Sequence, residues 1–330
     1  MTPSKSSIDR LAKFVSEAWE DDLKMLETKL RAAIEVPPAA VSIAVSLDGV
    51  FVPMDRTNRT PETLACAAAS DEAGEGSSGY REVACGTIAF CDAAGEMISA
   101  IRMARAPEQH KATLKAMLTE TVRIVKEKRP DLAVVKIADG APDNWTFLAS
   151  DALPPGPQIL DNFHANEHLH EALAVAHGAE TTNTKLEFQH WRGVLRWDDG
   201  GADKVIEELE RLSQERPRSK VLIREIKYFE KNKHRMNYLP MGRAGFMIGS
   251  GVVEAACKTV ATQRLKQSGM RWSQAGAQAI LTPHSWDQSG RFDQAWAILA
   301  ATFETKISIY RPLTLVKPQP TPIPANDASR

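Results

Sequence analysis

Two largely apolar runs of this chain each end in an aspartate that a glycine follows. Residues 41–47 lead into Asp48, and residues 132–138 lead into Asp139. The second run is apolar on both faces, which is typical of a central parallel strand covered on both sides of a sheet. Because open α/β sheets place their sites at the carboxyl ends of parallel strands, the two aspartates are expected to emerge together at one edge.

A glutamate in a later segment completes a set of three acids. Glu254 lies just inside a helix that a Gly-Ser-Gly run at 249–251 opens. Three carboxylates repel one another unless divalent cations neutralise them, and two such ions can activate an attacking oxygen and stabilise a leaving one. Transfer of polynucleotide strands needs such a set. We therefore predict that Asp48, Asp139 and Glu254 are catalytic residues and metal ligands.

The predicted elements around the first aspartate follow the order β-β-β-α-β. A polar loop at 55–81, expected to be mobile, precedes a hairpin at 83–102. A helix at 108–126 has apolar residues at i, i+3 and i+4 spacing and leads to the strand ending at Asp139; a fifth strand is predicted at 158–163. This order matches a ribonuclease-H-like fold, which is α/β with a mixed five-stranded sheet flanked by helices.

The remaining segments are predicted to be mainly helical. An amphipathic helix is expected at 8–34, and residues 200–233 look almost wholly helical, which indicates an all-helical insertion before the last catalytic helix. The predicted division is an N-terminal helical remnant at 1–40, the first part of the core at 41–170, the insertion at 171–240, the C-terminal helices of the core at 241–311 and a disordered Pro-rich tail at 312–330.

Composition places few limits on function. The 330 residues are 43% hydrophobic and 25% charged, which is ordinary for a globular protein. The net charge of -1 gives no overall signature of nucleic-acid binding, so a DNA-binding surface must come from local basic clusters. No run approaches the roughly 18 apolar residues of a membrane span, and no signal peptide is recognisable. We expect a cytoplasmic protein with reduced cysteines and no membrane role.

Residues 242–272 are richest in chemically informative side chains. Val253, Cys257 and Val260 are spaced to pack inward, whereas Glu254 and Lys258 share another face. A carboxylate in the first turn followed by basic residues suits a metal ligand beside a DNA backbone. The alternative is a surface helix with an ordinary Glu–Lys pair. On the first interpretation, phosphate contacts are predicted for Lys258, Arg264, Lys266 and Arg271.

Four motifs together resemble bacterial insertion-sequence DDE transposases of the ISKra type, which are related to the Mutator-like transposases. The motifs are Ser46-Leu-Asp-Gly49, Ala138-Asp-Gly-Ala-Pro142, Gly-Ser-Gly-Val-Val-Glu-Ala-Ala-Cys-Lys at 249–258 and Arg264-x-Lys266-x-x-Gly-Met-Arg-Trp272. The resemblance covers roughly residues 40–300. It implies a ribonuclease-H-like core, two Mg²⁺ ions that Mn²⁺ can replace, and cleavage and transfer of DNA strands at insertion-sequence ends.

The resemblance also implies roles for particular residues and partners. Asp48, Asp139 and Glu254 correspond to the catalytic triad, and Asp161-Asn-Phe-His164 corresponds to an Asp-x-x-His motif of such families. His164 is therefore expected to orient groups or contact DNA near the triad. Asp161 could be a carboxylate that holds the metal ligands in position without binding the metal itself. The implied partners are transposon-end DNA, target DNA and further copies of the chain on DNA. The implied location is the bacterial cytoplasm, associated with the nucleoid.

Two departures from the family pattern motivate an alternative function. Only about 40 residues precede the first strand, whereas relatives carry a longer N-terminal region that recognises transposon ends. Pro283 stands where the last helix should continue, and a proline there should break or kink it. These features favour a truncated or decayed copy that binds DNA without cutting it as the alternative.

A third hypothesis comes from a different motif. His164-Ala-Asn-Glu167-His168 fits the inverted zincin pattern H-x-x-E-H, in which two histidines one helical turn apart bind zinc and the glutamate acts as a base. No downstream carboxylate stands out as a third ligand. The zinc metallopeptidase hypothesis also assigns no role to the two strands that lead into aspartates or to residues 249–272.

Overall fold

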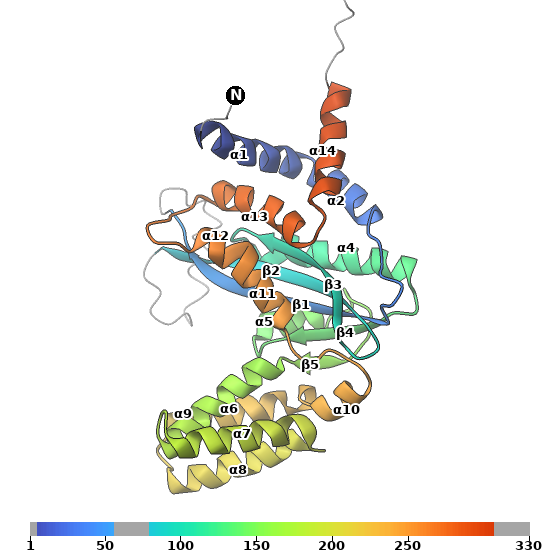
Figure 1. The fold of residues 1–330 in the computed structure, drawn as a ribbon. Coiled ribbons are helices and arrows are strands. Elements are labelled where there is room, and N and C mark those ends of the chain that lie inside the picture. Colours follow the sequence, from blue (N-terminus) through green and yellow to red (C-terminus); the bar gives the residue numbers. More distant parts are fainter. Residues whose placement is uncertain (1–4, 56–78, 307–330) are drawn as a thin grey trace, which may run out of the picture.

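A five-stranded mixed sheet forms the centre of the computed structural model, which describes residues 5–55 and 79–306 (Figure 1). The strand order is β3-β2-β1-β4-β5. The first strand is antiparallel to the second and parallel to the fourth, so the sheet is compatible with a ribonuclease-H-like fold. The strands are β1 (Ser42–Pro53), β2 (Tyr80–Cys91), β3 (Met97–Arg105), β4 (Ala133–Ala138) and β5 (Gln158–Leu160).

The register of the strands places both predicted aspartates just beyond the last paired residues of the parallel β1–β4 pair, although β1 itself continues past Asp48 to Pro53. Ser46 lies beside Ile137 in the parallel β1–β4 pair, and Asp139 follows the last residue of β4. Asp48 lies opposite Cys85 in the antiparallel β1–β2 pair. The predicted parallel pairing of the first and fourth strands is therefore confirmed.

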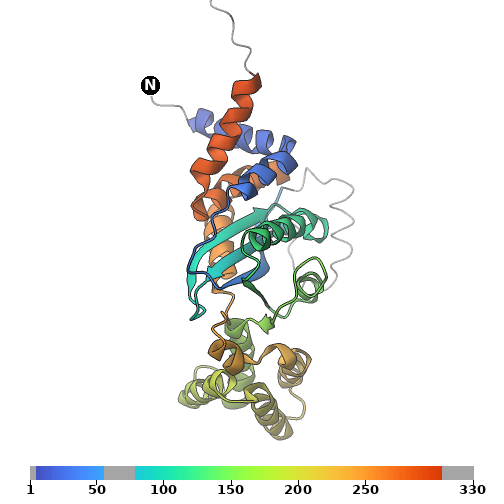
Figure 2. The ribbon, with the colours of Figure 1, turned by 90° about the vertical axis from the view of Figure 1, so that its right-hand side faces the viewer.

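Helices cover both faces of the sheet (Figures 1 and 2). On one face, α4 (Ala112–Lys128) packs so closely on Gly86 that an added Cβ would lie 2.9 Å from Leu118. The other face carries the C-terminal helices, whose buried side chains form a second apolar cluster with β1 and β2. These are α11 (Gly251–Ala256), the π-helical segment η3 (Cys257–Thr262), α12 (Gln263–Leu265) and α13 (Gln274–Gln288).

A group of helices lies beyond the β5 edge of the sheet (Figure 1). The helical prediction for residues 200–233 is confirmed, and apolar residues such as Leu169, Leu195 and Phe229 join these helices to the apolar core of the sheet. Three short helices lie in the connections. η1 (Gln109–Lys111) joins β3 to α4, α5 (Pro142–Leu148) lies between β4 and β5, and η2 (Lys233–Arg235) joins α9 to α10. The group comprises α6 (Asn162–His177), α7 (Thr182–Trp197), α8 (Gly201–Glu215), α9 (Lys220–Asn232) and α10 (Tyr238–Arg243).

The single helix predicted at 8–34 is wrong, because the segment forms two helices. α1 (Lys5–Asp21) packs along α13, whereas α2 (Leu23–Ala32) packs against α4 and α14 (Phe292–Lys306). One straight helix could not follow both sets of partners, so the chain turns at Asp22.

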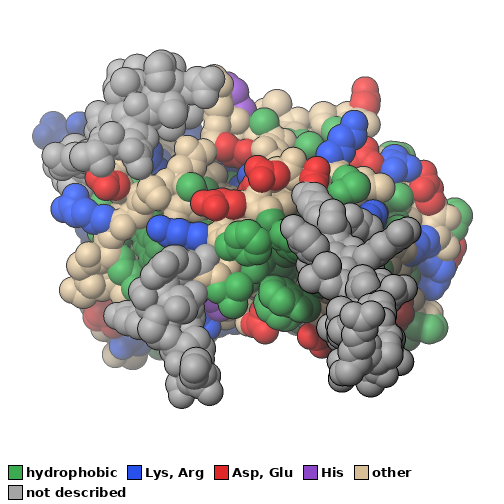
Figure 3. Space-filling model, turned by 90° about the horizontal axis from the view of Figure 1, so that it is seen from above, with side chains coloured by type: hydrophobic (Ala, Val, Ile, Leu, Met, Phe, Trp, Pro, Cys, Tyr) green, Lys and Arg blue, Asp and Glu red, His purple; other side chains and the backbone are tan. Residues whose placement is uncertain are grey.

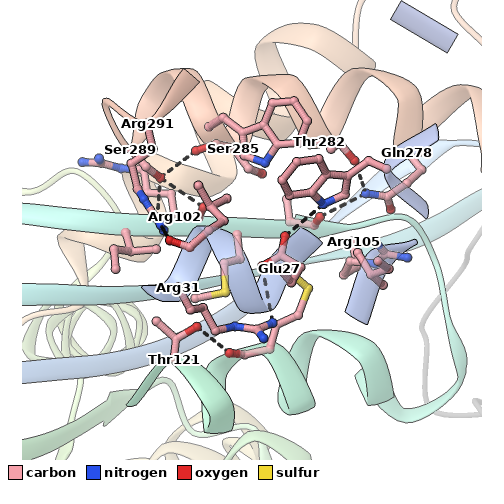
Figure 4. A pocket seen from close by; sticks show the side chains of 18 of the residues that line it. Glu27, Arg31, Arg102, Arg105, Thr121, Gln278, Thr282, Ser285, Ser289 and Arg291 are labelled. Carbon is pink, nitrogen blue, oxygen red and sulfur yellow. Dashed lines mark hydrogen bonds and ion pairs between the residues drawn. The ribbon is translucent and has the colours of Figure 1, made fainter. Parts of the chain in front are cut away.

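The N-terminal helices close a small cavity over β3 and α13 that apolar as well as polar side chains line (Figure 4). Trp19 packs edge-on against Trp286, with 4.4 Å between ring centroids, and donates a 3.1 Å hydrogen bond to Glu27. Burial raises the pKa of Glu27, and the ion pair with Arg31 opposes that rise. The cavity measures about 30 Å³, which accommodates water but no substrate.

Helix α13 continues through Pro283, so the predicted break is wrong. The proline removes one backbone donor, but the helix is held between β3 and α1 by buried side chains on both sides of the proline, including Leu281 and Trp286. Packing of this kind outweighs the loss of one intrahelical hydrogen bond.

Hydrophobic side chains are also exposed near the chain ends (Figure 3). On α1 and α14 they include Leu11, Phe14 and Trp296, and the ring of Phe14 stacks on Phe303. Within the described ranges, no helix is both long and apolar enough to cross a bilayer. Most of the expected loop at 55–81 and the whole predicted Pro-rich tail at 312–330 lie outside the residues described.

The N-terminal helices should contribute to the stability of the core. Trp19→Ala removes a side chain that is only 1% exposed and leaves the carboxylate of Glu27 without its indole donor. We expect a loss of roughly 3–5 kcal/mol in the free energy of unfolding, measured by urea denaturation. The matched change Trp197→Ala, at a ring that is 62% exposed, should cost no more than about 0.5 kcal/mol. Equal losses in the two variants would contradict a structural role for α1.

Candidate active site at the carboxyl ends of the parallel strands

Asp48 and Asp139 form a pair of interacting carboxylates. Burial raises the pKa of Asp48, and the negative charge of Asp139 raises it further, whereas the Gly49 N–H, which donates a 2.6 Å hydrogen bond to Oδ1 of Asp48, opposes the rise. The parallel pairing of β1 and β4 thus brings these two predicted residues together. A nearby cation would relieve their mutual repulsion.

Two further polar residues hold this pair in place. Asn144 on α5 is buried and donates one hydrogen bond to Oδ1 of Asp139 (3.0 Å) and one to the carbonyl of Leu47 (3.3 Å). Lys111 donates to Asn144 (3.2 Å) and forms an ion pair with Glu82 (2.9 Å), and its positive charge lowers the pKa of Asp48.

Sequence reasoning missed both residues. Only Asn144 could have been predicted from the sequence, because it lies in the first turn of α5, the helix that begins soon after the strand ending before Asp139. Lys111 comes from η1, far away in sequence, so only the tertiary structure reveals its position.

The helix that carries Glu254 packs over the same strands. The predicted inward residues Val253, Cys257 and Val260 are all buried, and the thiol of Cys257 lies 3.7 Å from Oδ2 of Asp48. Cys257 also lies one turn beyond Glu254, so the helix brings Glu254 to this end of the sheet. Proximity of Cys85, burial and the charge of Asp48 raise the pKa of the Cys257 thiol, which therefore stays protonated.

Asp161 connects the helical insertion to the Glu254 helix. It caps α6 by accepting hydrogen bonds from the backbone of Phe163 (3.2 Å) and His164 (3.1 Å), and it accepts a third from the N–H of Ser250 (2.8 Å). Gly249 permits this approach, because a Cβ there would lie 3.0 Å from the Phe163 ring. The side chain of Asp161 is 2% exposed.

Glu254 and Asp161 form a second carboxylate pair. Partial burial raises the pKa of Glu254, and the charge and proximity of Asp161 raise it further. The hydroxyl of Ser250 donates to Oε1 of Glu254 (3.1 Å), which opposes the rise. Ser250 occupies the position before α11, but its side chain binds Glu254 and forms no capping hydrogen bond to the backbone.

The site therefore contains four carboxylates, arranged as an Asp48–Asp139 pair and an Asp161–Glu254 pair. Within the described ranges, the ligand atoms of Asp48, Asp139 and Glu254 do not all lie within 4.8 Å of one another. Two metal ions about 3.5–4 Å apart need ligands spread over a wider region than one ion does. An all-oxygen donor set of this kind suits Mg²⁺ or Mn²⁺ better than zinc.

A different group of three ligand atoms is close-packed on the insertion. Among the described residues, the group within 4.8 Å consists of His168, Glu171 and Glu225. Arg224 already forms ion pairs with both glutamates, so its guanidinium group provides the positive charge that a metal ion would otherwise provide.

The inverted zincin motif is not arranged as a ligand set. Nδ1 of His168 faces Glu225 at 2.5 Å, whereas Nδ1 of His164 pairs with Glu167 at 3.1 Å. The close-packed group thus contains His168 but neither His164 nor Glu167, the other two residues of the motif.

The four basic residues that are predicted to contact DNA follow Glu254 along the chain. All four basic side chains are exposed, and none forms an ion pair with an acidic residue in the described part of the chain. The segment that carries them is fixed at its end, where Trp272 pairs with the end of β1 through hydrogen bonds with Pro53 and Asp55. The four residues are Lys258, Arg264, Lys266 and Arg271.

Comparison with known proteins adds little to this geometry. No protein-family model and no curated protein matches the chain. Among solved structures, it is similar to a Drosophila P element transposase strand transfer complex, with a TM-score of 0.29 and 11% sequence identity over 91% of this chain and 74% of that one. A TM-score this low carries no argument about function, so the site is interpreted from its own residues.

Removal of the Asp161 charge should lower the pKa of Glu254. In Asp161→Asn the neighbouring negative charge disappears, so Glu254 loses its proton at a lower pH than in the parent protein. NMR titration of the Glu254 carboxyl carbon measures this shift. Asp143→Asn, an exposed change on α5 where Asp143 pairs with Lys115, should leave the titration unaltered. An unchanged Glu254 titration in Asp161→Asn would show that the two carboxylates do not interact.

Proposed function

We propose that the protein is a DDE transposase of the bacterial insertion-sequence ISKra type, which cleaves DNA strands at insertion-sequence ends and transfers them to target DNA. The observation that supports this most strongly is the Asp48–Asp139 pair on parallel strands beneath a helix that carries Glu254. In the proposed reaction, water attacks a phosphodiester and releases a 3′ hydroxyl. That hydroxyl then attacks a phosphodiester of the target.

The residues of the site would have two kinds of role, metal binding and orientation of the metal ligands. When bound by Asp48, Asp139 and Glu254, two Mg²⁺ or Mn²⁺ ions would act as Lewis acids on the attacking and leaving oxygens. Asn144 holds the carboxylate of Asp139 beside β1, and Ser250 holds that of Glu254. These hydrogen bonds would keep the acids oriented before DNA arrives.

The exposed basic residues after Glu254 would bind the DNA backbone, with His164 as a further contact. Phosphate contacts by Lys and Arg are largely independent of base sequence and release counterions. The His164 ring is partly exposed and adjoins Asp161 through the first turn of α6, so it lies at the border of the site. Further copies of the chain would assemble on the same DNA.

Asp139→Asn should abolish DNA cleavage while leaving DNA binding intact. The substitution preserves the shape of the side chain but removes a negative charge that the metal site needs, and that charge also repels phosphate. Cleavage of a DNA fragment carrying the sequences that flank the gene, in Mn²⁺, and binding to the same fragment should be compared with the wild type. Asp199→Asn, at an exposed loop position, should cleave normally.

Two outcomes of this experiment would favour the alternatives. Binding without cleavage by the wild type would favour a decayed copy. The proposed function predicts that His168→Ala retains activity well above that of Asp139→Asn. The reverse order would contradict the assignment of Asp139 as a metal ligand. The zinc metallopeptidase hypothesis would be favoured by absence of DNA cleavage together with stoichiometric zinc in the purified protein that His168→Ala loses, because His168 would then be a ligand.

The basic segment should determine the salt dependence of DNA binding. Arg264→Ala combined with Lys266→Ala should weaken binding to all sequences similarly and reduce the slope of log K against log[salt] by about 2, since each phosphate contact contributes about 0.9. Lys227→Ala combined with Lys231→Ala removes the same charge from exposed positions on α9 and serves as the control. Equal slopes for both double variants would show that residues 264 and 266 do not contact DNA.

A further inference from the structure

Tyr228 brings a side chain of the helical insertion to the backbone beside Asp139. A Cβ added to Gly140 would lie 2.6 Å from Cε2 of Tyr228 and 3.3 Å from its hydroxyl oxygen, so the ring packs on the glycine directly after the aspartate. Burial raises the pKa of Tyr228, and the charges of Asp139 and Asp161 raise it further. A tyrosine phenol is protonated at neutral pH, because its ordinary pKa is about 10, and so it can donate a hydrogen bond.

The hydroxyl of Tyr228 is shielded from solvent and has no hydrogen-bond partner among the described residues. Buried polar groups are normally paired, so an unpaired donor at a candidate active site needs an explanation. The nearby carboxylates do not supply a partner. Oδ1 of Asp139 already accepts from Asn144 and Ala141, and both oxygens of Asp161 accept backbone hydrogen bonds.

The insertion holds the Tyr228 ring firmly. His168 stacks on it, with 3.6 Å between ring centroids and 22° between planes. Nδ1 of His168 faces Glu225 at 2.5 Å, and Glu225, which is fully buried, also pairs with Arg224. The close-packed His–Glu group on the insertion is thus a support for the tyrosine ring.

We propose that Tyr228 is a catalytic residue whose phenol donates a hydrogen bond to a non-bridging oxygen of the phosphodiester beside Asp139. This inference rests on the proposed DNA strand transfer. A phosphate oxygen is a charged acceptor, and hydrogen bonds to charged acceptors are among the strongest in proteins. The ring is held in position by His168, so the donor would need only to be uncovered when the phosphodiester binds, and stabilisation by a pre-positioned donor accelerates phosphoryl transfer.

Tyr228→Phe tests the proposal because it removes only the hydroxyl and keeps the stacked ring. Single-turnover cleavage of the flanking-sequence DNA in Mn²⁺ should slow by about 10–100-fold, with unchanged DNA affinity and thermal midpoint. Tyr238→Phe removes another buried hydroxyl, on α10, and should cleave at the wild-type rate. A Tyr228→Phe rate equal to that of the wild type would overturn the proposal.

A second measurement does not depend on cleavage. With 3-fluorotyrosine at position 228, the ¹⁹F resonance should shift when a duplex of the flanking sequence is added in Ca²⁺, whereas the same label at position 238 should not respond. If the wild type binds this DNA but does not cut it, the proposed function fails and this measurement decides the role of Tyr228. A resonance at 228 that does not move at saturating DNA would overturn the phosphate contact.

Discussion

The parallel pairing of β1 with β4 is the constraint on which the candidate site depends. It sets Ser46 beside Ile137 and so brings Asp48 and Asp139 to the same end of the β1–β4 pair, where the charge of Asp139 raises the pKa of Asp48. A slip of one residue would turn the side chains of a strand to the opposite face. Buried residues on both faces of the sheet prevent such a slip, so the packing of the core and the geometry of the site are determined together.

The carboxylate of Asp161 performs a corresponding role for the insertion. It caps α6, where the chain enters the helical group, and binds the N–H of Ser250, where the chain returns to the sheet. Asn162 donates to the carbonyl of Ile248 at the same point. Residues 162–249 therefore leave and rejoin the core through one small junction. An insertion closed in this way can be accommodated without moving the strands on either side of it.

The four carboxylates of the site make its stability depend on pH and on bound cations. Both Asp48 and Glu254 have raised pKa values, because each is partly buried and lies near another acid. A raised carboxyl pKa means that the charged form destabilises the fold as the pH rises, whereas protonation or a bound cation relieves the repulsion. Lys111 supplies only part of the compensation, since it also pairs with Glu82. Cation binding is thus expected to stabilise the protein by relieving this repulsion, whereas the phosphates of DNA are repelled by the same carboxylates until cations are bound.

Sequence alone determined the features that depend on local pattern. Alternating and continuous apolar runs predicted the strands and the parallel pairing of the first with the fourth, and helical spacing predicted the buried face at Val253, Cys257 and Val260. These predictions succeeded because the apolar pattern of a strand or a helix face is set by residues that are close together in the chain. The roles of the three acids as metal ligands and of the basic residues as DNA contacts stay predictions.

Only the tertiary structure decided which distant side chains meet. It paired Glu254 with Asp161, placed Lys111 near Asp48 and set Tyr228 against Gly140. It also overrode local signals, since packing on separate partners divides the N-terminal helix and packing on both sides carries α13 through Pro283. These outcomes depend on contacts between segments far apart in sequence, whose energies no local pattern records.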